Sequence, residues 1–387
     1  MKPYRNLAAA QTILLLAGLI SAAILSAAPV SAQGLNAPVD DWRRYWPKTD
    51  FTKHSVPLNE IKSGGPPKDG IPPVDHPKFI SVEQAAKWVH ATEPVMVFSH
   101  KGDVRAYPLQ ILMFHEIVND VVGGRPVVIT FCPLCNSALV FDRTVKGRVL
   151  DFGTTGKLRN SDLVMWDRQT ESWWQQLVGE AIVGALTGAR LDFLPSPLVS
   201  FQTFREAHPE GKVLSRDTGI ARNYGSNPYV GYDRYAAPIP SFFPGRVDKR
   251  LPAMERVVAL ELGGEIVAYP YSELAKQPVL NTTVGGREVV IYFKMGTVSA
   301  LDGRLIRESR DVGSTVVFLR GVDGRTLTFA TKDGHLVDQE TGTRWNMLGQ
   351  AVAGPLRGKK LKDVVYANHF AFAWLAFRPN SKIYRAK

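Results

Sequence analysis

The feature that most constrains this chain is an internal repeat that covers much of its sequence. Residues 102–131 read "GDVRAYPLQILMFHEIVNDVVGGRPVVITF" and align without a gap with "GEIVAYPYSELAKQPVLNTTVGGREVVIYF" at residues 264–293. Further on, "DRQTESWWQQLVGEAIVGALTGARL" (167–191) aligns with "DQETGTRWNMLGQAVAGPLRGKKL" (338–361) with one deletion. Self-similarity at a fixed spacing is the signature of a repeated structural unit. We therefore predict a tandem duplication of a unit of roughly 130 residues.

The duplication predicts five parts. These are a signal peptide (1–32), an N-terminal extension (33–92), a first repeat unit (93–214), an inter-repeat segment (215–254) and a second repeat unit (255–387). Short apolar runs between glycine-rich turns predict the α+β class, with a mainly antiparallel β unit and one or two short helices per copy. We call the two copies the first unit and the second unit. In the first unit, residues 109–122 carry helical periodicity and 200–209 predict another short helix.

The N-terminus predicts export. Lys2 and Arg5 precede an uncharged apolar run that ends at Val30, and small residues follow. This order is typical of a signal peptide cleaved after Ala32, and an uncleaved anchor is the alternative. We therefore expect a periplasmic or extracellular protein that is not integral to the membrane after cleavage.

The charge pattern does not favour nucleic acid as a partner. The formal net charge is +11, and it falls to +9 when Lys2 and Arg5 are removed. Cationic residues are scattered, and their densest cluster is the short "RGKKLK" at 357–362. Nucleic-acid binding proteins instead gather Lys and Arg on one face. The partner that we expect is an unknown small molecule or a component of the cell envelope.

A duplication also supplies an internal control, because features present in both copies are explained by the fold. The polar candidates concentrate in the first unit, and the second unit has the character of a degenerate copy. By the gapless alignment, Cys132 and Cys135 correspond to Lys294 and Thr297, while His115 and Glu116 correspond to Gln277 and Pro278. The first unit alone has the run "KLRNSDLVMWDR" at 157–168.

The two cysteines, in "TFCPLCNSALVFDR", allow three chemistries. They lie in a predicted turn between two strands, with Pro133 after the first. An exported compartment is oxidising enough for a local Cys132–Cys135 disulfide, although so short a loop stabilises little through chain entropy. A redox-active pair is the second possibility. Cys132, Cys135 and His115 are accordingly the candidate catalytic residues.

A metal site is the third possibility. Two thiolates in a turn resemble half of a zinc site and need further ligands. His115 is the nearest histidine in the sequence, so the tentative ligand set is Cys132, Cys135 and His115, with Glu116, Asp142 and Asp162 as substitutes. Zinc or copper would suit these donors.

The polar run after the cysteines predicts a site for an anionic or hydroxylated ligand. Its candidate ligand-binding residues are Arg159, Asn160, Ser161, Asp162, Arg168 and Trp173. The alternative is structural: the Asn-Ser-Asp triplet would cap a turn and Arg168 would pair with a carboxylate. A hydrolase with Ser161 as nucleophile is disfavoured, because no G-x-S-x-G elbow is present.

Several segments together resemble the bacterial and archaeal family called domain of unknown function 3179. They are "HEIVND", "TFCPLCNSALVFDR", "LRNSDLVMWDRQTESWW", "GEAIVGALTGARL" and "LSRDTGIARNYGSNPY". The resemblance implies an exported protein of α+β type and implies no reaction. Asn136 departs from the family pattern, where glycine is expected after the second cysteine.

The function that we predict is that of an exported cell-envelope protein with a C-x-x-C redox or metal-binding site in its first unit. The alternative is a non-catalytic ligand-binding module braced by a Cys132–Cys135 disulfide. The sequence leaves open whether the protein is an enzyme.

Overall fold

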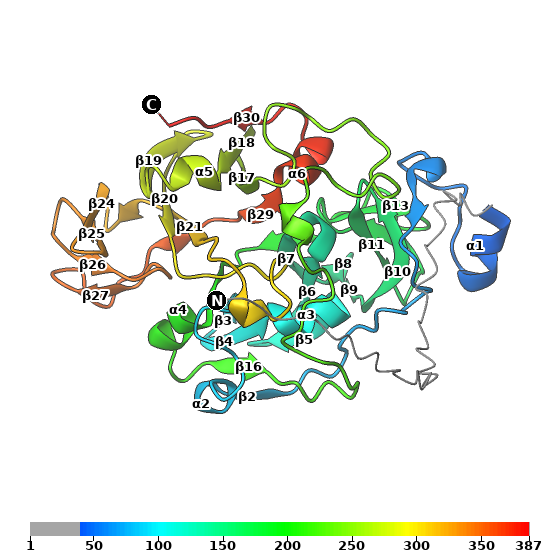
Figure 1. The fold of residues 1–387 in the computed structure, drawn as a ribbon, viewed down its shortest axis with the longest axis horizontal. Helices are drawn as coiled ribbons and strands as arrows, with labels where there is room; N and C mark the ends of the chain where they lie inside the picture. Colours follow the sequence, from blue (N-terminus) through cyan, green and yellow to red (C-terminus); the bar gives the residue numbers. More distant parts are fainter. Residues whose placement is uncertain (1–38, 387) are drawn as a thin grey trace, which may run out of the picture. The chain divides into compact units, whose positions relative to one another are not determined.

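The computed structural model describes residues 39–386 and has a mainly β fold with few helices (Figure 1). The predicted signal peptide therefore lies outside the described residues. The helices are α1 (Val39–Tyr45), α2 (Val82–Ala85), α3 (Leu109–His115), α4 (Phe201–Ala207), α5 (Tyr271–Leu274) and α6 (Ala371–Phe377). Within the described part of the chain, no helix has the length and apolar character needed to cross a membrane.

Three main sheets contain the strands of the first unit and of the segment before it. One has the order β15-β3-β4-β16-β2, from β2 (Phe79–Ser81), β3 (Pro94–His100), β4 (Asp103–Pro108), β15 (Leu198–Ser200) and β16 (Lys212–Leu214). The next has the order β14-β7-β6-β5, from β5 (Ile117–Val122), β6 (Arg125–Cys132), β7 (Ser137–Asp142) and β14 (Asp192–Leu194). The third has the order β1-β10-β11-β12-β13, from β1 (Lys62–Ser63), β10 (Phe152–Arg159), β11 (Asp162–Asp167), β12 (Trp173–Gln175) and β13 (Glu180–Val183). A small hairpin joins β8 (Thr144–Val145) to β9 (Arg148–Val149).

The second unit has three corresponding sheets. The first is β29-β17-β18-β30, from β17 (Arg256–Leu262), β18 (Glu265–Pro270), β29 (Ala367–Phe370) and β30 (Lys382–Ile383). The second is β19-β20-β21-β28, from β19 (Val279–Val284), β20 (Arg287–Lys294), β21 (Ser314–Leu319) and β28 (Lys362–Asp363). The third is β24-β25-β26-β27, from β24 (Phe329–Lys332), β25 (His335–Asp338), β26 (Arg344–Trp345) and β27 (Ala351–Ala353). Its small hairpin joins β22 (Gly321–Val322) to β23 (Arg325–Thr326).

The two units share individual hydrogen bonds as well as strand order. The buried carboxylate of Asp167 accepts a hydrogen bond from the indole nitrogen of Trp174 at 2.9 Å, and Asp338 accepts one from Trp345 at 2.9 Å. The side chain of Asn119 bonds both backbone groups of Phe152, while Asn281 does the same to Phe329. These residues occur in both units because the fold uses them.

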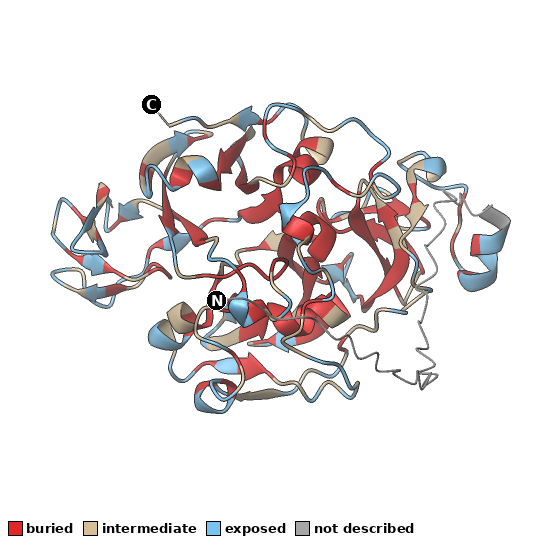
Figure 2. Cartoon of the chain, in the orientation of Figure 1, coloured by how far each residue is buried: buried red, intermediate tan, exposed pale blue. Residues whose placement is uncertain are grey.

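The units also contact each other reciprocally. Strand β29 of the second unit packs against β7 of the first, and β15 of the first unit packs against β21 of the second. Since β15 and β29 occupy corresponding places, as do β7 and β21, the two contacts are equivalent. Apolar side chains from both units meet in the interior, where most strand residues are buried (Figure 2).

One predicted element is partly wrong. The helical periodicity of residues 109–122 gives a helix only to His115, where α3 ends, and Ile117–Val122 is strand β5. Glu116 separates the two with a left-handed backbone (φ 57°). The β-branched residues that follow favour a strand, and this strand pairs with β6. The apolar residues of the helix and of the strand happen to be spaced 3 to 4 apart, so the sequence pattern continues across the boundary between the two elements.

Candidate functional site

The cysteines lie in a tight turn between two strands, as the sequence predicts. Strand β6 ends at Cys132, the 3-10 turn η2 spans Pro133–Cys135, and Cys132 is paired with Ser137 at the start of β7. Asn136 closes the turn with φ 49°, a left-handed conformation that asparagine adopts more readily than most residues. This conformation explains how Asn136 replaces the expected glycine.

The turn exists only in the first unit. In the second unit Lys294, at the end of β20, pairs with Ser314 at the start of β21. A long loop, 295–313, therefore stands where the first unit has four residues, 133–136. The gapless pairing of Cys135 with Thr297 is wrong for this reason, although the pairing of Cys132 with Lys294 holds.

Both cysteines are free thiols buried in the protein. Cys132 is 2% exposed and Cys135 is fully buried, and no bond joins their sulfur atoms. The disulfide of the alternative prediction is thus absent from this structure. The two sulfur atoms and a carboxylate oxygen of Asp162 all lie within 4.8 Å of one another.

Asp162 reaches the cysteines because a hairpin is longer in the first unit. Strands β10 and β11 pair from Phe152↔Asp167 to a tip at Arg159↔Asp162, whereas β24 and β25 pair from Phe329↔Asp338 to a tip at Lys332↔His335. The hairpin spans 152–167 in the first unit and 329–338 in the second. The residues unique to the first unit therefore form the end of the hairpin that meets the cysteine turn.

Hydrogen bonds reach only one of the two carboxylate oxygens of Asp162. Its Oδ2 atom accepts hydrogen bonds from Gln175 Nε2 at 2.6 Å and from the Leu177 backbone N–H at 2.9 Å. Its Oδ1 atom is buried and has no hydrogen-bond partner among the described residues. Burial raises the pKa of Asp162 to about 7. A proton acceptor of that strength beside two thiols can exchange protons with them near neutral pH.

Glu116 adds a second buried carboxylate. It follows α3, and its carbonyl oxygen accepts a hydrogen bond from the Phe131 N–H at 2.8 Å, one residue before Cys132. Burial and the negative charge of Asp162 raise the pKa of Glu116 to about 8. In the second unit Pro278 accepts the same backbone bond from Phe293 at 2.8 Å. The fold therefore requires the carbonyl at this position and does not require the carboxylate.

The electrostatic environment keeps the thiols protonated. Burial raises the pKa of Cys132, and the carboxylates of Asp162 and Glu116 raise it further. The pKa of Cys135 is raised well above its usual value, first by burial and then by Cys132. The hydrogen bonds to the Asp162 carboxylate come from neutral groups, the Gln175 amide and the Leu177 N–H. The site thus gathers two carboxyl groups and two thiols.

Buried polar atoms without hydrogen-bond partners concentrate around the same turn. Besides Asp162 Oδ1, they include the hydroxyl oxygens of Ser137 and Ser161 and the side-chain carbonyl oxygen of Gln175. Native proteins pair most buried polar atoms, so a cluster of exceptions marks a place where chemistry or binding outweighs stability. Ser161 also has a left-handed backbone (φ 63°), which is uncommon outside glycine.

The inter-repeat segment covers the site, although none of its residues is among the candidates predicted from the sequence. Tyr232 donates its hydroxyl to the Leu134 carbonyl at 3.1 Å, and the Phe242 carbonyl accepts from the Ser161 N–H at 2.9 Å. Burial raises the pKa of Tyr229 above its usual range, and the nearby Glu116 and Cys132 raise it further. The only sequence signal was the density of aromatic residues in this segment.

His115 is not part of the cysteine cluster, contrary to the tentative ligand set. Its Nδ1 atom bonds the Pro72 carbonyl at 2.7 Å, and its Nε2 atom bonds the Tyr224 hydroxyl at 2.6 Å. Both ring nitrogens therefore hold neighbouring segments onto α3. The position at the end of α3 directs the histidine away from the cysteines and towards the chain around Pro72. Asp142 is also engaged elsewhere, in an ion pair with Arg125 at 2.8 Å.

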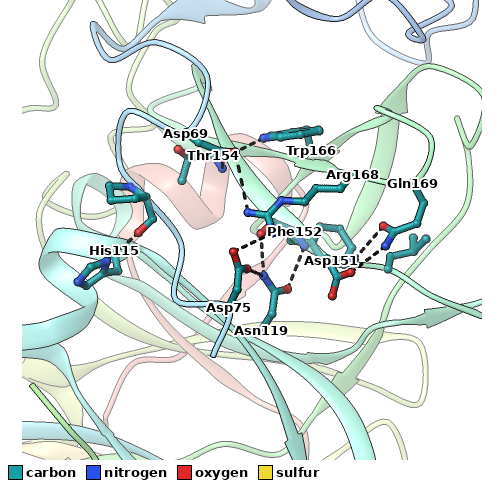
Figure 3. A network of polar contacts seen from close by, with 12 residues as sticks. Asp69, Asp75, His115, Asn119, Asp151, Phe152, Thr154, Trp166, Arg168 and Gln169 are labelled. Carbon is teal, nitrogen blue, oxygen red and sulfur yellow. Dashed lines mark hydrogen bonds and ion pairs between the residues drawn. The ribbon is translucent and has the colours of Figure 1, made fainter. Parts of the chain in front are cut away.

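The predicted ligand-binding residues separate into two groups. Ser161 and Asp162 adjoin the cysteines, and Asn160 precedes them in the hairpin turn with φ 52°. The others have structural partners. Arg168 forms an ion pair with Asp75 at 2.8 Å, beside Asn119 (Figure 3), and Arg159 forms one with Glu60 at 2.8 Å.

Trp173 is fully buried in an aromatic cluster. Its ring lies 5.1 Å from Trp42 and 4.9 Å from Trp46, measured between centroids. It therefore anchors the N-terminal extension to the first unit and is not exposed to a ligand. The alternative assignment of Arg168, as a partner of a carboxylate, is the one that the structure supports.

Comparisons with known proteins place the chain in a family without assigning a reaction. No curated protein and no solved structure matches it. A family model described as "Protein of unknown function (DUF3179)" matches residues 68–381, which include the cysteine turn, the long hairpin and both units. Since this match covers most of the 387 residues, the chain belongs to the DUF3179 family of proteins of unknown function.

Proposed function

We propose that Cys132 and Cys135 form a redox-active dithiol and that Asp162 accepts their protons. The observation that carries the proposal is the unpartnered Oδ1 atom of Asp162, in a carboxylate that lies within 4.8 Å of both sulfur atoms. A buried thiol reacts only as the thiolate, so it needs an acceptor for its proton inside the protein. Asp162, with a pKa of about 7, is such an acceptor.

The reaction that fits is thiol–disulfide exchange with a low-molecular-weight disulfide. Cys132, which is slightly exposed, gives its proton to Asp162 and attacks one sulfur of the acceptor. A mixed disulfide forms as the acceptor's S–S bond breaks, and the leaving thiolate takes up the proton. Cys135 then loses its proton by the same route and attacks Cys132, which releases a second thiol. Two electrons thus pass from the cysteine pair to the acceptor.

The internal comparison supports this assignment. The short cysteine turn, the end of the long hairpin and Glu116 are three differences between the units, and they meet at one place. The positions that the units share instead carry scaffold bonds, such as those of Asp167 and Asp338. We infer that the chain arose by tandem duplication, that the first unit holds the active dithiol, and that the second unit is a scaffold that lost it or never had it.

The test uses the full chain and 2-hydroxyethyl disulfide as the acceptor. We expect the wild-type protein to form an internal disulfide, detected as resistance of both thiols to alkylation after acid quenching. Cys135→Ser should accumulate a mixed disulfide between Cys132 and the acceptor. Cys132→Ser should form a mixed disulfide much more slowly, because it lacks the attacking thiol. Thiols that stay free in the wild-type protein at every acceptor concentration would refute the redox proposal.

A second candidate function is metal binding through Cys132, Cys135 and Asp162. The observation that favours it is the convergence of these three donor atoms, all of them buried. Two thiolates and a carboxylate suit Zn²⁺, and Cu(I) would favour the thiolates. A native mass that exceeds the chain by one metal ion, lost in Asp162→Asn, would support this candidate over the first.

The proposal also includes the place where the protein acts in the cell. We propose that residues 1–32 direct export and that the protein acts in the periplasm or outside the cell, on a small molecule or an envelope component. Cleavage after Ala32 would be visible as the N-terminal sequence of the mature protein, and an intact N-terminus in the exported fraction would contradict it.

A further inference from the structure

A groove of about 270 Å³ lies between helix α4 of the first unit and the sheet β24-β25-β26-β27 of the second (Figure 1). Lys294 lines the groove and ends strand β20, as Cys132 ends β6. Asn346 also lines it, at the position that Gln175 has in the cysteine site, because each follows the tryptophan that bonds the shared buried carboxylate. The groove is therefore the counterpart, in the second unit, of the cysteine site.

Two differences between the units explain why this counterpart is open. In the first unit the tip of the long hairpin reaches α6, where the Arg159 guanidinium lies 5.6 Å from the ring centroid of Phe377. In the second unit the hairpin is shorter and its tip lies at Lys332 and His335. The matching helix α4 ends in Ala207, where α6 ends in Phe377. The shorter hairpin and the smaller side chain leave the groove accessible.

The groove carries cations where the cysteine site carries acidic groups. Lys294 and Arg344 are exposed and line its wall. The Nη2 atom of Arg344 lies 2.8 Å from Nε2 of His335, and since a guanidinium has no acceptor, the imidazole nitrogen accepts this bond and helps to orient the guanidinium. The wall also holds the carboxylate of Glu206, which accepts a hydrogen bond from Gln202. Two permanent positive charges therefore face the groove against one negative charge.

The groove also has an apolar surface. Leu336, Met347 and Val352 line it, and Val352 is 44% exposed. An engineered apolar cavity of about 150 Å³ is enough to bind benzene, so a groove of this volume admits a ring with a charged substituent. Cations beside an apolar surface suit a ligand that has both an anionic group and a hydrocarbon part.

We propose that this groove binds a small organic anion with a hydrocarbon body, whose carboxylate or phosphate oxygens are bound by Lys294 and Arg344. The planar fork of an arginine matches two oxygens of one such group, and a lysine adds a compact positive charge. Leu336 and Met347 pack against the hydrocarbon body. This binding is independent of the cysteine chemistry and gives the second unit a role of its own.

The test compares three probes of similar size and different charge on the full chain, by isothermal titration or ligand-observed NMR. They are benzoate, benzyl alcohol and benzylamine, which is a cation at neutral pH. We expect benzoate to bind about tenfold more tightly than benzyl alcohol, as hydrogen bonds to a charged group give, and benzylamine to bind most weakly. Lys294→Gln and Arg344→Gln should each reduce the preference for benzoate to about threefold, and the double variant should abolish it. Both positions are exposed, so the fold should tolerate these substitutions.

Two variants are the controls. Lys87→Gln removes an exposed positive charge outside the groove and should keep the full preference for benzoate. Cys132→Ser should keep it as well. The inference is overturned if benzoate does not bind, if benzylamine binds as tightly as benzoate, or if the Lys294→Gln, Arg344→Gln double variant keeps the full preference. An equal loss in Lys87→Gln would overturn it too, because the net charge of the protein would then attract the anion, and a loss in Cys132→Ser would assign the anion to the cysteine site instead.

Discussion

The carboxylate of Asp162 and the thiol of Cys132 lie within 4.8 Å of each other, and both groups are buried. Gln175 and the Leu177 N–H fix one oxygen of the carboxylate and leave the other without a hydrogen bond. The Asp162 carboxylate, with a pKa of about 7, can therefore accept a proton near neutral pH. It lies beside a thiol whose pKa is raised by burial. This arrangement leads to the first two predictions.

Asp162→Asn should slow disulfide formation by about 100-fold at pH 7, because general-base catalysis typically contributes a factor of this order. The measurement is the rate of thiol loss with 2-hydroxyethyl disulfide. Glu93→Gln is a suitable control, since Glu93 is another buried carboxyl with a raised pKa and bonds Gln110 instead of a cysteine. Equal rates in Asp162→Asn and the wild-type protein would remove Asp162 from the mechanism.

The same carboxylate should make stability depend on pH. Its folded pKa of about 7 lies above the ordinary value of 3.8, so the folded state favours the protonated form. The contribution is fully present below about pH 4 and is lost as the pH rises through 7. Relative to Asp162→Asn, the wild-type protein should therefore lose up to about 4 kcal/mol of unfolding free energy between pH 4 and pH 8.

Denaturant unfolding of both proteins at several pH values checks this, because the difference between them cancels the titration of other groups. Glu116→Gln should show the same sign between about pH 4.5 and 8, since burial raises the pKa of Glu116 to about 8. A difference that does not change with pH would mean that Asp162 is accessible to water in the folded state.

The bonds that the two units share should have similar energies. Asp167→Ala and Asp338→Ala each leave a buried indole N–H without an acceptor, which should cost about 2 kcal/mol of unfolding free energy. Asp192→Ala, at an exposed position, should change stability by less than about 0.5 kcal/mol. If only one of the two buried substitutions destabilised the protein, the view that both carboxylates serve the scaffold would be wrong.

Arg168 should affect local order and not redox chemistry. Its ion pair with Asp75 attaches the segment before the first unit, so Arg168→Ala should increase proteolytic cleavage near residues 69–75 severalfold. Arg190→Ala removes an exposed ion pair and serves as the control. Slower thiol oxidation in Arg168→Ala, with unchanged proteolytic cleavage, would instead indicate that Arg168 takes part in the chemistry of the cysteine site.

The sequence alone predicted the cysteine turn and the mainly antiparallel β character of the chain, because these depend on local patterns. It could not place Asp162 beside Cys132, since that contact depends on the length of a hairpin and on how two sheets meet. His115 is the histidine nearest to the cysteines in the sequence, yet in the fold its ring nitrogens bond Pro72 and Tyr224 instead.

The most direct test of the central claim is the intact native mass of the purified protein, measured before and after oxidation with 2-hydroxyethyl disulfide and then after denaturing alkylation. The redox account predicts no bound ion, a mass that falls by two hydrogens on oxidation, and full recovery of both thiols on reduction. A bound metal ion that leaves on denaturation, with Cys132 and Cys135 then free to alkylate, would contradict it and assign the cysteines as ligands.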